Sequence, residues 1–254
     1  MQMGGGKMIK LTKSSTVPPT LMGQSVQNEK NVIQTKIRNG QKPESKDFKY
    51  ELYGAQDVKD QLRKDQHDKC IFCECTLLDK DGGEVEHFRP KTAYRQDKTK
   101  GSYKKPAYYL CAYEWENLSL SCHACNRRKH VFFPLFNPND RFTSKENPIL
   151  INPFNVDPAA HLEFKRYEVF PKFNTNGNKD EMARWMIEEL DMLNRPDLVE
   201  LRKRRYEEFL DEMEEKGITF DDLLKQKEGR EIKHGRSPEC IEFYGMFTNQ
   251  KIKF

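Results

Sequence analysis

Four cysteines stand in two Cys-x-x-Cys pairs, Cys70 with Cys73 and Cys122 with Cys125. Each spacing lets both thiolates reach one ion from a tight turn, and two such pairs complete a tetrahedral zinc shell. A closed shell has no open position for water or substrate, so this zinc is expected to stabilise the fold rather than to perform chemistry. His123 lies between the second pair and remains an alternative ligand.

Four other residues have the side chains that phosphodiester hydrolysis needs. Glu86, His87 and Asn117 lie between the cysteine pairs, and Asn126 directly follows Cys125. The reaction requires a base that activates water and a divalent ion that stabilises the pentavalent phosphorus and the leaving oxygen. We expect His87 to act as the base, because an ordinary imidazole is largely neutral at pH 7, and Asn117 to orient its ring. Glu86 and Asn126 offer hard oxygen ligands for Mg(II) or Mn(II).

Local geometry restricts how these residues can meet. Adjacent side chains of an extended strand point to opposite faces, so Glu86 and His87 serve one site only if a turn or bulge re-aims one of them. Asn126 is placed by the second cysteine pair, because that pair fixes where the following helix begins. The zinc knuckle and the hydrolytic site are therefore predicted to be one unit.

Several cations flank the predicted site. A role in binding substrate phosphates would explain them, and a solvated helix face is the alternative for those that follow Asn126. The candidate substrate-binding residues are Arg89, Lys91, Arg127, Arg128 and Lys129.

The elements around the site are predicted from composition and periodicity. Residues 1–25 combine Gly, Ser and Pro with several lysines and predict an extended basic arm. Residues 26–135 form the domain that holds the cysteine pairs, and the Pro- and Asn-rich residues 136–179 form a connector. Residues 180–254 are predicted to be a helical domain that begins with two amphipathic helices, one from Asp180 to about 193 and one over 196–216. These helices either dock a partner or pack a core.

Overall composition sets only wide bounds. The net charge of +4 over 254 residues permits nucleic-acid binding without indicating it. Seven cysteines, four of them in Cys-x-x-Cys pairs, favour metal binding in a reducing compartment over disulfides. No apolar run is long enough to span a bilayer, and the N-terminus lacks a secretory signal, so we expect a soluble cytoplasmic protein with no membrane partner.

Taken in order, the site residues resemble the HNH endonucleases. In that superfamily a ββα-metal motif carries an acidic-His pair on its first strand, Asn on its second, and His or Asn on its helix. Glu86-His87, Asn117 and Asn126 occupy these positions, although Asp is commoner than Glu at the first and His is commoner than Asn at the last. The resemblance implies an α+β fold with an HNH core and a four-cysteine zinc site in residues 26–135, followed by a mainly helical C-terminal region.

A narrower resemblance covers most of the chain and is to the PtuB family. It is carried by the motifs at residues 70–74, 85–91, 114–118, 122–129, 133–135 and 150–153. Proteins of that family are nuclease components of Septu-type antiphage systems and of some retrons, and they act with an ATPase of the PtuA kind. The resemblance implies such a partner, and through it contact with a retron RNA/DNA complex.

The predicted substrate is nucleic acid. DNA is favoured and RNA, including tRNA, stays open, because the reaction engages the phosphate and not the 2′-hydroxyl. The competing interpretation is a non-catalytic zinc-finger module that binds nucleic acid or protein and uses Glu86, His87 and Asn117 only for packing.

Overall fold

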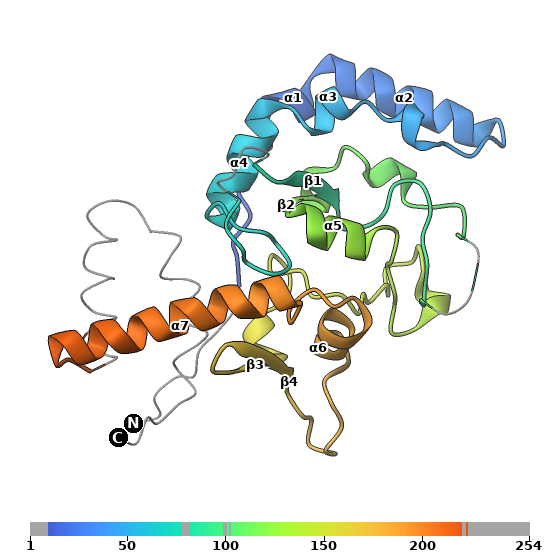
Figure 1. Ribbon diagram of the computed structural model, residues 1–254. Coiled ribbons are helices and arrows are strands. Elements are labelled where there is room, and N and C mark those ends of the chain that lie inside the picture. Colours follow the sequence, from blue (N-terminus) through green and yellow to red (C-terminus); the bar gives the residue numbers. More distant parts are fainter. Residues whose placement is uncertain (1–9, 78–81, 99–100, 102, 220–221, 223–254) are drawn as a thin grey trace.

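The computed structural model describes residues 10–77, 82–98, 101, 103–219 and 222 (Figure 1). The fold mixes helices with two small antiparallel sheets, each of two strands. None of the helices in these residues combines the length and the apolar composition needed to cross a bilayer.

Helices dominate the N-terminal part of the described chain. They are α1 (Pro19–Met22), α2 (Gln24–Arg38), α3 (Tyr50–Tyr53) and α4 (Gln56–Gln66), with a 3-10 turn at Ser45–Asp47. Helix α4 buries Val58, Leu62 and Gln66, which lie four positions apart on one face. It ends at His67, whose φ of 53° gives the left-handed conformation of a helix C-cap.

Of the predicted N-terminal arm, residues 10–18 pack against the body, and a helix begins directly after them. Helix α1 begins at Pro19, where proline's missing N–H costs nothing. Before it, the Leu11 N–H donates to the Pro153 carbonyl at 2.9 Å, and the Ser14 N–H donates to the Asp65 carboxylate at 2.8 Å. The described arm therefore joins residues that are far apart in the sequence.

The centre of the molecule is a hairpin followed by a short helix. Strand β1 (Glu84–His87) pairs antiparallel with β2 (Leu118–Ser121), in a register that sets Glu86 opposite Ser119. Two 3-10 turns, Tyr109–Cys111 and Trp115–Asn117, precede β2, and α5 (His123–Lys129) follows it. Every residue of β2 is buried, so this strand lies inside the core and β1 lies beside it.

The C-terminal half contains a second hairpin and a long helix. After 3-10 turns at Pro138–Asp140 and Pro158–Ala160, strands β3 (Leu162–Lys165) and β4 (Glu168–Pro171) pair antiparallel. Helix α6 (Glu181–Arg184) continues as a π-helical turn, Trp185–Glu189. Helix α7 (Pro196–Lys216) agrees with the predicted second helix. Apart from Asp222, the predicted helical tail over 220–254 lies outside the described residues.

The predicted first helix of this half is only partly correct. Asp180 caps it as expected, since its side chain accepts the Ala183 N–H. The regular helix stops after one turn, and the chain widens into the π turn before Asp191 takes a φ of 48°. The apolar side chains of this predicted amphipathic segment are nevertheless buried, at Met182, Trp185, Met186, Leu190 and Leu193.

One hydrophobic core joins the two halves. Cys73 from the first cysteine pair, Leu120 from β2 and Leu193 from the segment before α7 belong to the same buried cluster. In Figure 1, α7 runs below the central β1, β2 and α5 unit and starts close to it. The C-terminal segment therefore packs directly against the element that carries the second cysteine pair.

Candidate active site and metal centre

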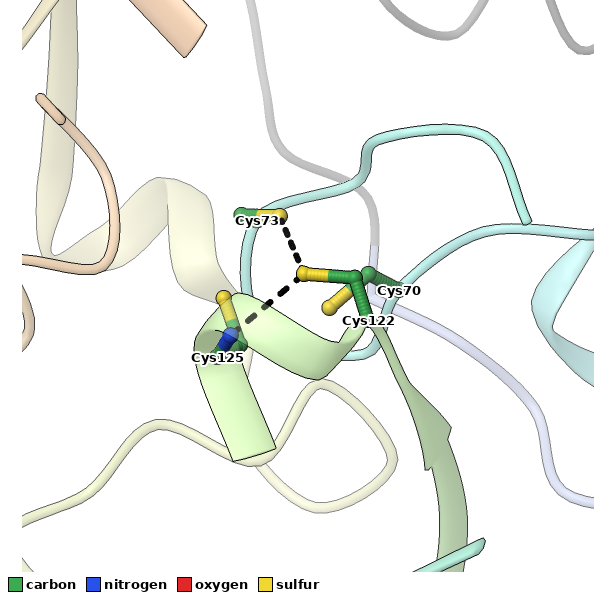
Figure 2. A group of neighbouring side chains, drawn as sticks. All are labelled: Cys70, Cys73, Cys122 and Cys125. Atoms are coloured by element: carbon green, nitrogen blue, oxygen red, sulfur yellow. Dashed lines mark hydrogen bonds between the residues drawn. The ribbon is translucent and has the colours of Figure 1, made fainter. Parts of the chain in front are cut away.

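The four paired cysteines meet in one cluster (Figure 2). Cys70 and Cys73 come from the loop after α4, Cys122 caps α5, and Cys125 lies in its first turn. Their sulfur atoms all lie within 4.8 Å of one another. The Cys73 and Cys122 sulfurs are 3.8 Å apart, which matches the edge of a tetrahedron with zinc–sulfur bonds of about 2.3 Å. These residues therefore fit a four-thiolate zinc ion.

His123 does not join this cluster. Its Nδ1 lies 2.7 Å from Glu84 Oε1, and 70% of its side chain is exposed. The alternative ligand considered from the sequence is therefore directed to a carboxylate instead of to the sulfur atoms.

Arg195, at the start of α7, contacts the sulfur cluster and was not predicted. Its Nη1 donates to Cys125 Sγ at 3.4 Å and to Cys73 Sγ at 3.7 Å, while its Nε donates to Asp197 at 2.8 Å. The residue is buried. Four thiolates around one divalent cation carry a net negative charge, and a buried guanidinium offsets part of it. No local spacing indicates this contact, because the partners are 70 residues apart.

His87 ends β1 and is held by contacts to both ring nitrogens. Its Nε2 lies 2.9 Å from the Ala112 carbonyl, and its Nδ1 lies 3.3 Å from Lys91 Nζ. Because a carbonyl only accepts, Nε2 carries the proton, and the neutral ring keeps its lone pair on Nδ1. Burial, together with the Lys91 charge, holds the pKa of His87 well below 6.5. The imidazole is therefore neutral near pH 7, as a base must be.

Glu86 forms a buried ion pair with Lys129. Lys129 Nζ lies 2.5 Å from Glu86 Oε1 and also donates to the His87 carbonyl at 2.8 Å. Burial raises the pKa of Glu86, and the Lys129 charge opposes that rise. The expectation that Lys129 binds substrate phosphate is corrected by its position, since the residue is 0% exposed. The Lys129 charge therefore compensates the buried carboxylate of Glu86.

Asn126 contacts a second carboxylate, that of Glu84, which the sequence analysis did not predict as part of the site. Glu84 accepts a hydrogen bond from the Asn126 amide nitrogen and contacts His123. Glu84 and Glu86 are two positions apart on β1 and so share a face. This spacing of two residues in a predicted strand could have indicated that Glu84 lies on the same face as Glu86. The Asn126 amide oxygen accepts no hydrogen bond from the described residues, so it is free to bind a cation.

Asn117 positions the backbone that follows His87. Its side-chain oxygen accepts the Arg89 N–H at 2.7 Å, and its amide nitrogen donates to the Arg89 and Cys111 carbonyls at 3.1 and 3.0 Å. The predicted hydrogen bond to the imidazole is not formed. Asn117 therefore holds the bend at residues 88 and 89 instead of the ring itself.

A cavity of about 310 Å³ brings most of the candidate residues together. Glu86 and His87 both line it, because the strand ends at His87 and the chain then bends. The other candidate residues on its wall are Lys91, Asn126 and Arg127.

The remaining candidates have other partners. Arg89 pairs with Glu146 at 2.8 Å, and Arg128 pairs with Asp191 at 3.1 Å. Of the five predicted phosphate contacts, only Lys91 and Arg127 therefore line the cavity.

The geometry defines a class of protein in which four clustered cysteines could hold a metal ion, and a separate cavity, lined by His87, Glu86 and Asn126, adjoins that cluster through α5. No protein-family model matches the chain. The chain resembles the Septu protein PtuB of Bacillus mycoides (strain KBAB4), with 37% identity over 142 residues, or 54% of this chain and 48% of that protein. It is also similar to the Septu protein PtuB of Bacillus thuringiensis, with 27% identity over 150 residues, or 59% of this chain and 45% of that protein. The predicted resemblance to the PtuB family is confirmed, and the chain spans about half the length of these relatives.

Proposed function

We propose that the protein is a metal-dependent endonuclease of the HNH type, in which β1, β2 and α5 form the ββα-metal core. The observation that carries the proposal is the shared cavity: a neutral His87, Glu86 and Asn126 all line it. A purely structural zinc module needs no buried, unprotonated imidazole at a cavity that is also lined by cations.

Each residue has a defined part in the proposed reaction. His87 takes a proton from water at Nδ1, while the Ala112 carbonyl holds the opposite ring nitrogen. Glu86 and Asn126 would hold Mg(II) or Mn(II) through their side-chain oxygens, and such an ion would supply stabilisation of the charge on the phosphate and on the leaving oxygen. Lys91 and Arg127 contact the phosphate. The four cysteines and their zinc fix the start of α5 and with it the position of Asn126.

The biological setting is proposed from the relatives. Both are named Septu protein PtuB, and this name supports a role as effector of an antiphage defence system. In that role the protein acts with an ATPase of the PtuA kind, and through it with a retron RNA/DNA complex where one is present. The substrate is nucleic acid, with DNA first and RNA or tRNA as the alternatives to be separated by assay.

The test compares purified wild type, His87→Ala and His161→Ala on plasmid, linear duplex DNA and structured RNA, with and without Mg(II) or Mn(II). His161 pairs with Asp180 and does not line the cavity, so it provides the matched histidine control. We expect cleavage to disappear only in His87→Ala, with zinc content and folding unchanged. Equal cleavage by wild type and His87→Ala would eliminate His87 as the base. The assay is repeated with the ATPase partner if the isolated protein is inactive.

A further inference from the structure

Lys91 contacts Nδ1 of His87, the ring nitrogen that carries the lone pair of the candidate base. Its ammonium is 3.3 Å from His87 Nδ1 and 4.7 Å from the centre of the Tyr53 ring. The other ring nitrogen is committed to the Ala112 carbonyl, and the Tyr53 ring packs against the imidazole with its centroid 4.7 Å away. A water that is to give its proton to His87 therefore has to occupy the position where Lys91 now donates.

In the described part of the chain, Lys91 also has no carboxylate within ion-pair distance. Among the described residues it forms no ion pair, and it is only partly exposed on the wall of the cavity. Burial, with the charge of Lys129, lowers the pKa of Lys91 to about 8 although Glu86 opposes the shift. A partly buried ammonium without a counter-ion is stabilised by an anion that enters the cavity. Arg127 also lines the cavity and adds a second positive charge for that anion.

The relative strength of the two contacts sets the direction of movement. A hydrogen bond from an ammonium to an anionic oxygen is shorter and roughly twice as strong as one between neutral groups. A phosphodiester oxygen is therefore a better acceptor for Lys91 than the neutral imidazole is. The flexible four-carbon stem of lysine allows the ammonium to change partners without a backbone shift.

We infer that Lys91 covers His87 Nδ1 in the free protein and transfers to a phosphate oxygen when nucleic acid binds, so that the base is exposed to water only in the substrate complex. This inference rests on the proposed nuclease function, since it assigns to the same site a substrate-dependent activation. Lys91 is then both a phosphate contact and the positioning residue that keeps the base unavailable to other reactions.

The test observes the His87 ring directly, by long-range proton–nitrogen NMR at pH 7.5 with no divalent cation, so that no cleavage takes place. Wild type, Lys91→Met and Lys64→Met are compared without and with a short DNA duplex. Lys64 is an exposed lysine of α4 and serves as the matched control. An Nδ1 lone pair that loses its hydrogen bond resonates further downfield.

In the free proteins we expect Nδ1 of Lys91→Met to lie downfield of wild type and of Lys64→Met. Adding DNA is expected to move Nδ1 of wild type and Lys64→Met downfield and to leave Lys91→Met nearly unchanged, while the affinity of Lys91→Met for DNA falls about tenfold for the lost charged contact. Equal Nδ1 shifts in free wild type and Lys91→Met overturn the inference, as does an unchanged wild-type shift with DNA bound. Neither measurement needs cleavage. A negative nuclease assay is therefore distinguishable from the absence of the proposed movement of Lys91.

Discussion

The buried pair of Glu86 and Lys129 gives the sharpest prediction for stability. Only 7% of the Glu86 side chain and 0% of the Lys129 side chain are exposed. Lys129→Met keeps most of the side-chain volume but leaves the Glu86 carboxylate without its charged partner. Removing one member of a buried ion pair costs about 3–5 kcal/mol. We expect a loss of that size in the free energy of unfolding.

A double-mutant cycle separates the interaction energy of the Glu86–Lys129 ion pair from the packing cost of the substitutions. In Lys129→Met, the second change Glu86→Gln removes the uncompensated charge, so the double variant is expected to be more stable than Lys129→Met alone. The matched control is Lys46→Met, because Lys46 pairs with Glu44 at the surface, with 79% and 60% of the side chains exposed. That change is expected to cost less than about 1 kcal/mol.

The assay is urea unfolding of the zinc-loaded proteins at pH 7.5, followed by the fluorescence of Trp115 and Trp185. The reasoning is refuted if Lys129→Met and Lys46→Met lose the same amount. It is also refuted if the double variant is less stable than Lys129→Met by the full cost of Glu86→Gln alone, because the two side chains would then be energetically independent.

Three further predictions concern the cysteine cluster and the N-terminal arm. Removing zinc with a chelator is expected to lower the midpoint of thermal unfolding, because a structural zinc ion contributes folding energy directly; an unchanged midpoint after verified zinc loss would contradict the site. Arg195→Met is expected to speed zinc transfer to a chromophoric chelator at least about tenfold through loss of its charged contacts, whereas Arg184→Met, which changes a pair with Glu181 outside the cluster, leaves the rate near wild type. Burial lowers the pKa of Lys13 from 10.5 to about 8. Between those values the unfolded chain binds the extra proton, so the Lys13 contribution to stability rises with pH from 8 to 10.5, on the order of 3 kcal/mol. The stability difference between wild type and Lys13→Met, measured by urea unfolding across that range, should follow this rise, and a flat difference would contradict it.

Sequence reasoning succeeded where the constraint was local. The Cys-x-x-Cys spacing predicted that the two pairs meet, and the sulfur cluster agrees. The proline and periodic leucines at the start of α7 likewise predicted its range. In both cases the residues that determine the structure lie within a few positions of one another.

The partners of charged side chains could not be predicted in this way. Lys129 follows Asn126 by one helical turn and was expected to face substrate, but its partner Glu86 is 43 residues away. Asn117 was expected to hold the His87 ring and instead holds the Arg89 backbone. Which polar group a side chain meets depends on how distant segments pack, and neither composition nor periodicity records that packing.

Both ends of α5 form hydrogen bonds with one short segment, residues 191–195. Near its start, Cys125 accepts from Arg195, and near its end, Arg128 donates to the Asp191 carbonyl and carboxylate. Arg195 is also the residue from which α7 begins. A tilt of α7 at its first turn would therefore move the Arg195 guanidinium relative to the sulfur atoms of Cys73 and Cys125. Movement of α7 would in turn be transmitted to α5, the helix that carries Asn126 on the lining of the cavity.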